Sequence, residues 1–222
     1  MRNSLLQKNS IIVIFTLILF LPVLAISEYA IQVPVIENPE IKIDGHLDEA
    51  CWKKATNVGN FIQLEPNEGE KPTSETEVLT WTDRTNLYIG FICYDNEPSN
   101  LRFTRTERDR FASVEWIDMQ VATDNPPTRV YELMVNPGGT QVDLIRPTPK
   151  QGDSAFDLDF KSYAQILKDR WTVEIAIPFK NLRFKEEKHH HFRVEFARFY
   201  SHGVKEEYSS WIPHTKGEPN TF

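Results

Sequence analysis

The sequence predicts an all-β protein, an antiparallel β-sandwich of roughly 8–11 strands with one short helix near the N-terminus. Fourteen Phe, seven Tyr and five Trp against only three Met, together with fourteen Pro, are typical of short strands broken by turns rather than of a helical bundle. Hydrophobic and polar residues alternate along most of the chain with the period of two that marks strands. The 222 residues, of which 40% are hydrophobic, suffice for one core of this size.

Residues 1–25 have the composition of an export signal. Arg2 and Lys8 lie in a segment without acidic residues, and an apolar run of fifteen residues follows from Ile11 to Ala25. The run is short for a transmembrane helix, which needs about 20 apolar residues. We therefore expect cleavage at the end of this run and an exported protein, periplasmic or extracellular, in which residues 26–222 form the sandwich. A retained membrane anchor is the alternative.

The segment from Leu47 to Ala55 is the best candidate for the short helix. It is one or two turns long, and Leu47, Ala50 and Cys51 could face inward. Before it, Asp44-Gly45 predicts a sharp turn, because Asp-Gly pairs favour tight turns. The helix is the one departure from β-structure that the sequence predicts.

Strands are predicted wherever the period of two continues for five residues or more. These segments are 77–83, 86–94, 115–123, 128–136, 140–145, 160–167, 171–176 and 192–200. Arg84-Thr85 joins the first two as a tight hairpin, and turns are expected at Asp124–Pro127 and Pro137–Gly139. Because there is no internal repeat and no linker with a shift in composition, we expect a single sandwich domain.

Charge and motif content exclude several classes of function. The chain has 32 acidic and 25 basic residues and a net charge of −7, so its overall field repels phosphate and we expect no nucleic-acid partner. The sequence contains no phosphate-cradling glycine loop, no C-x-x-C redox motif and no recognisable nucleophile motif. The functional residues must therefore come from the strands and loops of the sandwich itself.

The two cysteines leave two interpretations open. Outside the cytoplasm, Cys51 and Cys93 could form one disulfide. Cys93 also alternates with Leu87, Ile89 and Phe91 on a core-facing strand, where a buried free thiol behaves as a small hydrophobic residue.

Three consecutive predicted strands bring polar residues to one face. If the turn at Asp124–Thr128 is symmetric about residue 126, Gln120 lies opposite Glu132, Asp118 opposite Met134 and Trp116 opposite Asn136. The same construction for a turn over Pro137–Thr140 sets Asn136 against Gln141 and Met134 against Asp143. The resulting polar strip is Trp116, Asp118, Gln120, Glu132, Asn136, Gln141 and Asp143.

This strip has the chemistry of a carbohydrate site. A sugar ring offers an apolar C–H face that stacks on an aromatic side chain, and vicinal hydroxyls that pair with carboxylates and amides at strand spacing. The strip provides an indole, three carboxylates and three amides. A solvated sheet face is the alternative, because polar residues alternate outward on any half-exposed sheet.

Five separated segments resemble the carbohydrate-binding module family 9-like domain, in order and spacing across residues 41–213. The segments are Ile43-Asp44-Gly45-His46-Leu47-Asp48-Glu49-Ala50-Cys51-Trp52, Leu87-Tyr88-Ile89-Gly90-Phe91, Tyr131-Glu132-Leu133-Met134-Val135-Asn136-Pro137-Gly138-Gly139, Trp171-Thr172-Val173-Glu174-Ile175-Ala176-Ile177-Pro178-Phe179 and Asn181-Leu182-Arg183-Phe184. The resemblance implies a β-sandwich with a sugar-binding role. In the most similar subgroup it implies an exported bacterial protein whose sandwich precedes a region resembling an outer-membrane barrel.

The resemblance also has implications for the site. Sugar-binding members hold a carboxylate, an arginine and an amide at positions equivalent to Gln120, Met134 and Asn136, so only the amide is kept here. They clamp the sugar between two tryptophans, of which Trp116 lies near the first, whereas residues 214–222 contain no Trp for the second. Related domains begin a closing strand at about residue 220, which implies that the last strand is lacking from residues 26–222.

Two further chemistries follow from the acidic residues. Asp118, Glu132 and Asp143 could serve a glycoside hydrolase as acid and base or nucleophile. Calcium is a candidate cofactor, because carboxylates and amides gather in three loops. The loop residues are Asp95-Asn96-Glu97, Asp124-Asn125 and the trio Asp153, Asp157 and Asp159.

We therefore carry three functional hypotheses from the sequence. The first is a non-catalytic carbohydrate-binding module that serves carbohydrate catabolism and binds a glycan on the strip. The second is a structural domain that docks onto a downstream barrel region or a cell-envelope partner and binds no sugar. The third is a glycoside hydrolase.

Overall fold

A computed structural model describes residues 29–110, 115–147, 153, 156–202 and 204–213. The predicted leader, residues 1–25, lies outside the described residues, so its cleavage stays a prediction. In the described part of the chain, no helix has the length and apolar character needed to cross a membrane. The sandwich belongs to one unit of the chain that begins at Ile31.

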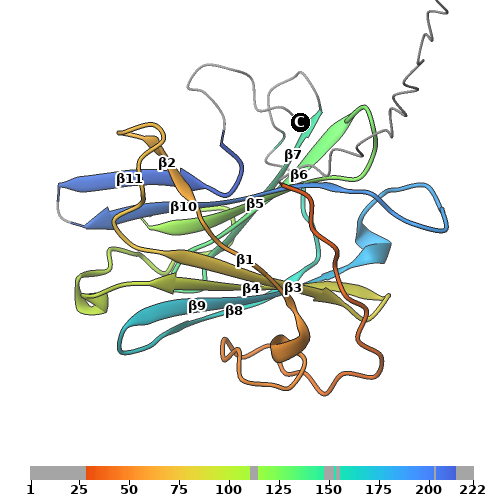
Figure 1. The fold of residues 1–222 in the computed structure, drawn as a ribbon, viewed down its shortest axis with the longest axis horizontal. Coiled ribbons are helices and arrows are strands. Elements are labelled where there is room, and N and C mark those ends of the chain that lie inside the picture. The colour runs from red at the N-terminus through yellow and green to blue at the C-terminus, as the bar shows by residue number, and fades with distance from the viewer. Residues whose placement is uncertain (1–28, 111–114, 148–152, 154–155, 203, 214–222) are drawn as a thin grey trace, which may run out of the picture. The chain divides into compact units, whose positions relative to one another are not determined.

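The predicted all-β architecture is confirmed: within the described residues, eleven strands form two layered antiparallel sheets (Figure 1). The five-stranded sheet has the order β1 (Thr56–Val58), β3 (Thr76–Thr82), β4 (Asn86–Tyr94), β9 (Arg170–Pro178) and β8 (Lys161–Ile166). The six-stranded sheet has the order β2 (Ile62–Glu65), β11 (Lys205–Ser210), β10 (Arg193–His202), β5 (Trp116–Ala122), β6 (Arg129–Val135) and β7 (Gln141–Pro147). The second sheet carries β5, β6 and β7 side by side, as the polar strip requires.

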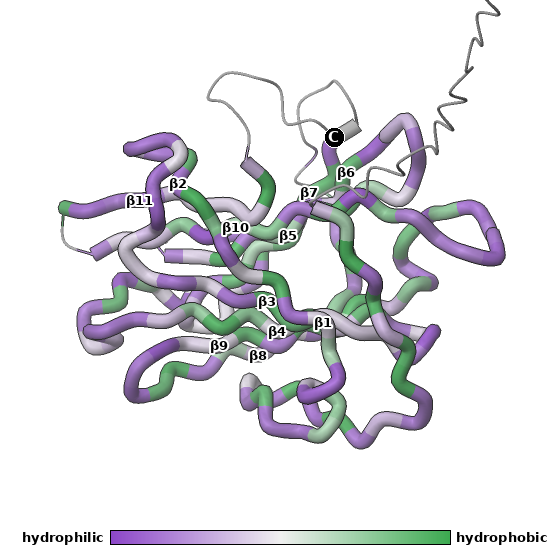
Figure 2. Tube along the Cα trace, in the orientation of Figure 1, coloured by the Kyte–Doolittle hydropathy of each residue, from purple (hydrophilic) through white to green (hydrophobic). Residues whose placement is uncertain are grey.

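The core lies between the two sheets and is filled by alternate residues of each strand. Phe91 and Ile175 from the five-stranded sheet, and Ile117, Leu133 and Phe196 from the six-stranded sheet, are almost fully buried there. Hydrophobic segments follow the strands, whereas the connecting loops are mostly hydrophilic (Figure 2). Because side chains alternate across a strand, the residues between these positions must face outward.

The predicted helix at Leu47–Ala55 is wrong. Only Trp52–Lys54 turns, as a 3-10 helix, and the chain before it runs irregularly across the outer face of the five-stranded sheet (Figure 1). The segment is held there by Glu174, which accepts hydrogen bonds from the backbone N–H groups of Asp44 (2.7 Å) and Gly45 (2.8 Å) and from the Trp52 indole (2.9 Å). A helix of one or two turns offers too few hydrogen bonds to outweigh these contacts and its own nucleation cost.

Gly45 lets this segment approach the sheet closely. Its φ is +89°, and a Cβ atom built on it would lie 2.9 Å from the Cβ atom of Gln165 on β8. An L-residue would therefore be strained both in its backbone and against the strand. The Asp44-Gly45 turn that the sequence predicts thus serves to seat the segment on the sheet.

The two cysteines are not paired. Cys93 is fully buried among the core residues between the sheets. Cys51 belongs to a second cluster, with Trp52 and Trp81, on the outer face of the five-stranded sheet. The sheet itself separates the two thiols, which excludes the disulfide and agrees with the alternative of a buried free Cys93.

Candidate functional site

The structure brings together four of the seven residues of the predicted strip, on the outer face of the six-stranded sheet. They are Trp116, Asp118 and Gln120 of β5 and Glu132 of β6. Gln120 lies opposite Glu132 and Asp118 opposite Met134, as the symmetric turn between β5 and β6 predicts. The intervening residues of β5 are buried in the core, so these side chains point away from it.

The register predicted between β6 and β7 is wrong by one residue. Val135 pairs with Gln141 and Leu133 with Asp143, instead of Asn136 with Gln141 and Met134 with Asp143. The three-residue loop Pro137-Gly138-Gly139 is centred on Gly138, and Gly139 adopts the left-handed conformation (φ +81°) that such hairpin loops use. A shift of one residue moves every side chain of a strand to the other face.

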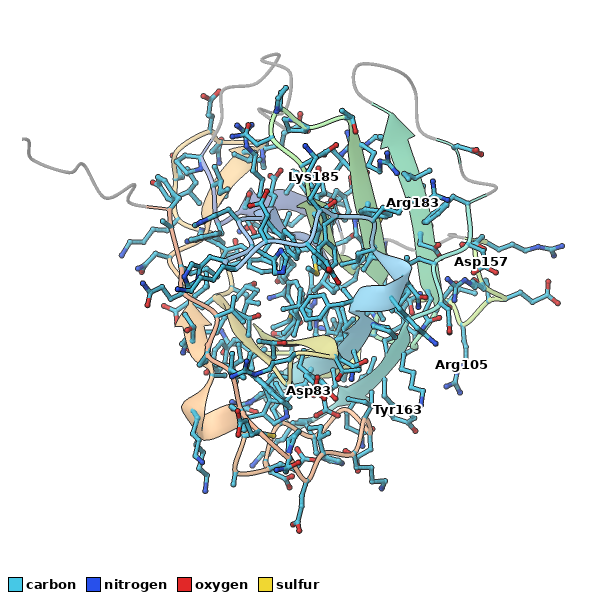
Figure 3. The ribbon with its side chains drawn as sticks, turned by 90° about the vertical axis from the view of Figure 1, so that its right-hand side faces the viewer. Asp83, Arg105, Asp157, Tyr163, Arg183 and Lys185 are labelled. Atoms are coloured by element: carbon cyan, nitrogen blue, oxygen red, sulfur yellow. The ribbon has the colours of Figure 1, made fainter. Side chains whose placement is uncertain are left out.

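Gln141 and Asp143 therefore lie on the inner side of β7, at the open edge of the sandwich. Arg108 donates hydrogen bonds to Gln141 (2.9 Å) and to Asp143, whose side chain is fully buried. Gln141 in turn donates to the Ser162 hydroxyl of β8 (2.7 Å), which links the last strands of the two sheets. Figure 3 shows Asp157, a further ion-pair partner of Arg108, along this edge. Both predicted site residues serve to close the edge.

Asn136 is also absent from the outer face, because its amide builds the β6–β7 turn. Its Oδ1 accepts a hydrogen bond from the backbone N–H of Thr140 (3.0 Å), and its Nδ2 donates to the carbonyl of Thr104 (3.1 Å). The side chain is almost fully buried. Both polar atoms of the amide are thus occupied within the protein.

Three aromatic residues form a half-buried platform on the outer face. Trp116 lies flat against Phe199 of the neighbouring β10, with ring centroids 4.2 Å apart and an angle of 8° between the planes. Tyr208 of β11 is the next residue across the sheet from Phe199. We call Trp116, Phe199 and Tyr208 the aromatic platform. Flat, partly exposed aromatic surface of this kind is what the apolar face of a sugar ring stacks on.

A polar cluster adjoins the platform and consists of Asp118, Gln120, Glu132 and Arg146. Gln120 donates to Asp118 Oδ2 (3.0 Å), and Tyr208 donates to the same oxygen (3.3 Å). Arg146 reaches across from β7, donates to Gln120 Oε1 and lies 2.9 Å from Glu132 Oε2. The resemblance implies an arginine at the position of Met134 on β6. In this structure a guanidinium lies beside the cluster, but it belongs to Arg146 of β7.

Burial makes the charged forms of the carboxyls in this cluster costly. Burial raises the pKa of Asp118 well above its usual range, and the neighbouring charges of Glu132 and Glu195 raise it further. Burial also raises the pKa of Glu132, although Arg146 acts in the opposite direction. For the same reason, burial beside Asp118 raises the pKa of Tyr208 well above its usual value. A cation that approached Asp118 would relieve this cost.

A buried ion pair links the two strands that carry Trp116 and Phe199. Glu115 directly precedes Trp116, and Arg198 directly precedes Phe199; their side chains are 0% and 1% exposed. Arg198 donates to Glu115 Oε1 from Nε (3.0 Å) and from a terminal nitrogen (2.8 Å), and Glu115 also accepts from the backbone of Ser201 (2.8 Å). Since the two charges satisfy one another only in this register, they hold Trp116 and Phe199 opposite each other.

The predicted calcium loops are engaged in other contacts. Asp95 lies 2.8 Å from His202 Nε2, Asp124 accepts from the backbone of Thr128 (3.1 Å), and Asp157 lies 3.0 Å from Arg108. Among the described residues, no group of three or more His, Cys, Asp or Glu side chains could hold a metal ion. The carboxylates of the described loop residues are therefore not arranged as a calcium site.

The carboxyl trio suggested for a glycoside hydrolase is not assembled. Asp118 and Glu132 share the outer face, whereas Asp143 is buried at the sandwich edge against Arg108. Asp118 and Glu132 are adjacent members of one cluster, so they do not flank an open space from two sides as that chemistry requires.

Sequence reasoning missed Phe199, Tyr208 and Arg146. Phe199 lies in a predicted strand, but the sequence does not reveal that β10 is the neighbour of β5. Tyr208 lies on β11, whose residues Lys205–Ser210 are too polar to show the alternation of a strand. Arg146 follows directly on the predicted strand at 140–145, and extending that strand by one residue would have placed it beside the cluster.

No protein-family model matches the sequence, and no curated protein matches it. Solved structures do share its fold. A proposed carbohydrate-binding protein from Bacteroides uniformis ATCC 8492 superposes with a TM-score of 0.65 at 10% identity, over 84% of this chain and 91% of that chain. A carbohydrate binding module of family 9 from Caldicellulosiruptor kristjanssonii, in complex with cellotriose, gives a TM-score of 0.54 at 14% identity, over 81% and 82% of the two chains. Its complex with glucose gives the same values over 80% and 82%. The family 9-like sandwich fold expected from the sequence is thereby confirmed.

Proposed function

We propose that the protein is a non-catalytic carbohydrate-binding module that holds a glycan on the outer face of its six-stranded sheet. The observation that carries the proposal is the half-buried Trp116, stacked on Phe199 and lying beside the polar cluster. One module of the same fold, solved in complex with cellotriose and in complex with glucose, supports it. A glycoside hydrolase is disfavoured, because its three carboxyls are divided between two surfaces.

The geometry assigns a part to each side chain. The aromatic platform takes the apolar face of a sugar ring, as stacked indole and phenyl rings do. Glu132 and Arg146 are 15% and 32% exposed, so they remain accessible to ring hydroxyls as acceptor and donor. Gln120 orients Asp118 and is itself oriented by Arg146. The site would thus combine stacking with directional hydrogen bonds.

Titration calorimetry with a panel of soluble glycans tests the proposal. We expect saturable heat with at least one glycan and its loss in Trp116→Ala, because truncation of a stacking aromatic at the centre of a site removes most of its binding energy. Tyr163→Ala is the matched control, since Tyr163 is a 46% exposed aromatic on β8 of the other sheet (Figure 3). Its binding should equal that of the wild type. Repeating the titration with calcium tests whether binding depends on that ion.

Absence of binding heat with every glycan of the panel would contradict the glycan proposal. Equal binding by Trp116→Ala and the wild type would contradict the proposed location. The first result would favour the alternative, a domain that docks onto a downstream barrel-like region or a cell-envelope partner and takes no sugar.

We also propose that the module acts outside the cytoplasm, in carbohydrate capture at the cell envelope. The support is the leader-like sequence of residues 1–25, with Arg2 and Lys8 before an apolar run. The intact mass of the protein recovered from its producing cells should correspond to a chain that begins near Ile26. A chain that keeps its first 25 residues would favour the membrane-anchor alternative.

A further inference from the structure

Among the residues that the structure describes, no cationic side chain forms an ion pair with the buried carboxyl of Asp118. It is 4% exposed, and both of its hydrogen-bond donors, the Gln120 amide and the Tyr208 hydroxyl, bind the same oxygen, Oδ2. The other oxygen, Oδ1, is buried and accepts no hydrogen bond. A buried acceptor without a donor costs about 1–3 kcal/mol, so it marks a position where a donor from outside would be bound strongly.

Among the described residues, the charged groups that act on Asp118 include two acidic side chains and one basic side chain. Glu132 of β6 and Glu195 of β10 flank it, while Arg146 of β7 is directed to Glu132 and Gln120 instead of Asp118. Tyr208 of β11 contributes a neutral hydroxyl. With a net charge of −7, the chain as a whole also attracts cations.

The aromatic platform reinforces a preference for positive charge. The faces of Trp, Phe and Tyr rings carry negative electrostatic potential and bind ammonium groups within about 6 Å. Trp116, Phe199 and Tyr208 are half-buried and thus present ring surface on the same side as Asp118. A ligand that combines an apolar ring face with an ammonium group would use both features.

We propose that the site prefers glycans that carry free, protonated amino groups, with the ammonium donating to Asp118 Oδ1. The inference rests on the proposed function of this face. Met134 lies directly opposite Asp118 in the register and is half-buried. Its unbranched thioether side chain adapts easily, so the surface beside Asp118 can adjust to admit an ammonium group.

Three tetramers with the same β-1,4-linked backbone test the preference. They are built from glucosamine, N-acetylglucosamine and glucose, and differ only at carbon 2, where they carry an ammonium, a neutral amide or a hydroxyl. At a pH where the amines are protonated, the glucosamine tetramer should bind the full chain about tenfold tighter than the glucose tetramer, as expected for a charge-assisted hydrogen bond. Equal or weaker binding of the glucosamine tetramer overturns the inference.

The outcomes separate this inference from the proposed function. If the glucose or N-acetylglucosamine tetramer binds and the glucosamine tetramer has no advantage, the inference fails and the glycan site stands. If no tetramer binds and the wider glycan panel is also silent, both fail.

Asp118→Asn keeps the shape of the side chain and removes its charge. In this variant, the affinity for the glucosamine tetramer should be close to the affinity for the glucose tetramer, so that their ratio approaches one. Asp48→Asn is the control, since Asp48 is exposed on the segment that covers the other sheet, and it should keep the wild-type ratio. An unchanged ratio in Asp118→Asn overturns the inference. If thermal unfolding shows that Asp118→Asn does not fold, Glu132→Gln replaces it. That change frees Arg146 to neutralise Asp118 and should also lower the ratio, and an unchanged ratio would count against the inference.

Discussion

At the scale of single residues, the ion pair of Arg198 and Glu115 is the strongest constraint on the candidate site. Arg198→Met keeps most of the side-chain volume but leaves Glu115 without its cation in a site that is 0% exposed. Because an uncompensated buried charge is costly, we expect a loss of about 3–5 kcal/mol in the free energy of unfolding. Urea denaturation followed by tryptophan fluorescence measures this loss.

The matched control is Arg84→Met. Arg84 also pairs with a glutamate, Glu37, at 3.3 Å, but the two side chains are 70% and 71% exposed. Exposed ion pairs contribute at most about 1 kcal/mol, so this variant should remain close to the wild type. Similar losses in the two variants would show that burial of the Arg198–Glu115 pair is not what makes it important.

At the scale of strands, Arg108 closes the open edge between β7 and β8. It contacts Gln141 and Asp143 of β7 and donates to the carbonyl of Leu158, which leads into β8. Arg108→Ala removes the cation beside the fully buried Asp143 carboxyl, which keeps its hydrogen bond from the Leu158 backbone N–H (2.6 Å). We therefore expect amide hydrogen exchange to accelerate in β7 and β8, because local opening costs less where edge contacts are lost.

The central strands β4 and β9 serve as the internal control for this exchange experiment. They pair with each other along nine residue positions and are flanked by further strands on both sides. Their protection should change far less than that of the edge strands. A uniform acceleration would indicate global destabilisation and contradict a local role for Arg108.

The strands that the sequence predicts are those long enough for hydrophobic and polar residues to alternate several times. The hairpin of β3 and β4 and the strands β5 to β10 begin and end within two residues of the predicted bounds. The strands β1, β2 and β11 were missed, because three to six residues of mixed polarity show no period. Their strand conformation comes from pairing with neighbours, which is a tertiary effect that overrides local pattern.

The parts of the candidate site formed by strands that follow one another in the sequence could be predicted. The parts formed by strands far apart in the sequence could not. The β5–β6 register follows from one turn, and it correctly brings Asp118, Gln120 and Glu132 together. The β6–β7 register fails because one glycine in the left-handed region shifts the centre of the loop. Phe199 reaches Trp116 only because β10 pairs with β5 across more than 70 residues of sequence, a contact that no local pattern encodes.

At the scale of the whole molecule, buried carboxyls determine how stability depends on pH. Burial raises the pKa of Glu115, Asp118, Glu132 and Asp143, and it raises that of Glu174 to about 7 from an ordinary 4.5. A carboxyl whose pKa is raised by folding favours the folded state when it is protonated. Its contribution is complete below the ordinary value and is lost as the pH rises through the raised one. The unfolding free energy should therefore fall between pH 5 and pH 8.

Glu174 should account for a measurable part of this fall. Its carboxylate accepts hydrogen bonds from Asp44, Gly45 and Trp52, which favour the charged form, yet burial outweighs them. In Glu174→Gln the titrating group is absent, so the decrease between pH 5 and pH 8 should be about 1–3 kcal/mol smaller than in the wild type. The quantity to compare is the slope of the unfolding free energy against pH. The absolute values are not compared, because the amide of the variant also loses hydrogen bonds and thereby lowers stability by the same amount at every pH. Carboxyls with lowered pKa values, such as those of Asp83 and Asp124, act in the opposite direction but only under acidic conditions, as the pH falls below their ordinary value of 3.8. Denaturation curves at five pH values between pH 5 and pH 8 measure this difference. If the unfolding free energies of the wild type and of Glu174→Gln fall equally with pH, Glu174 does not titrate in this range.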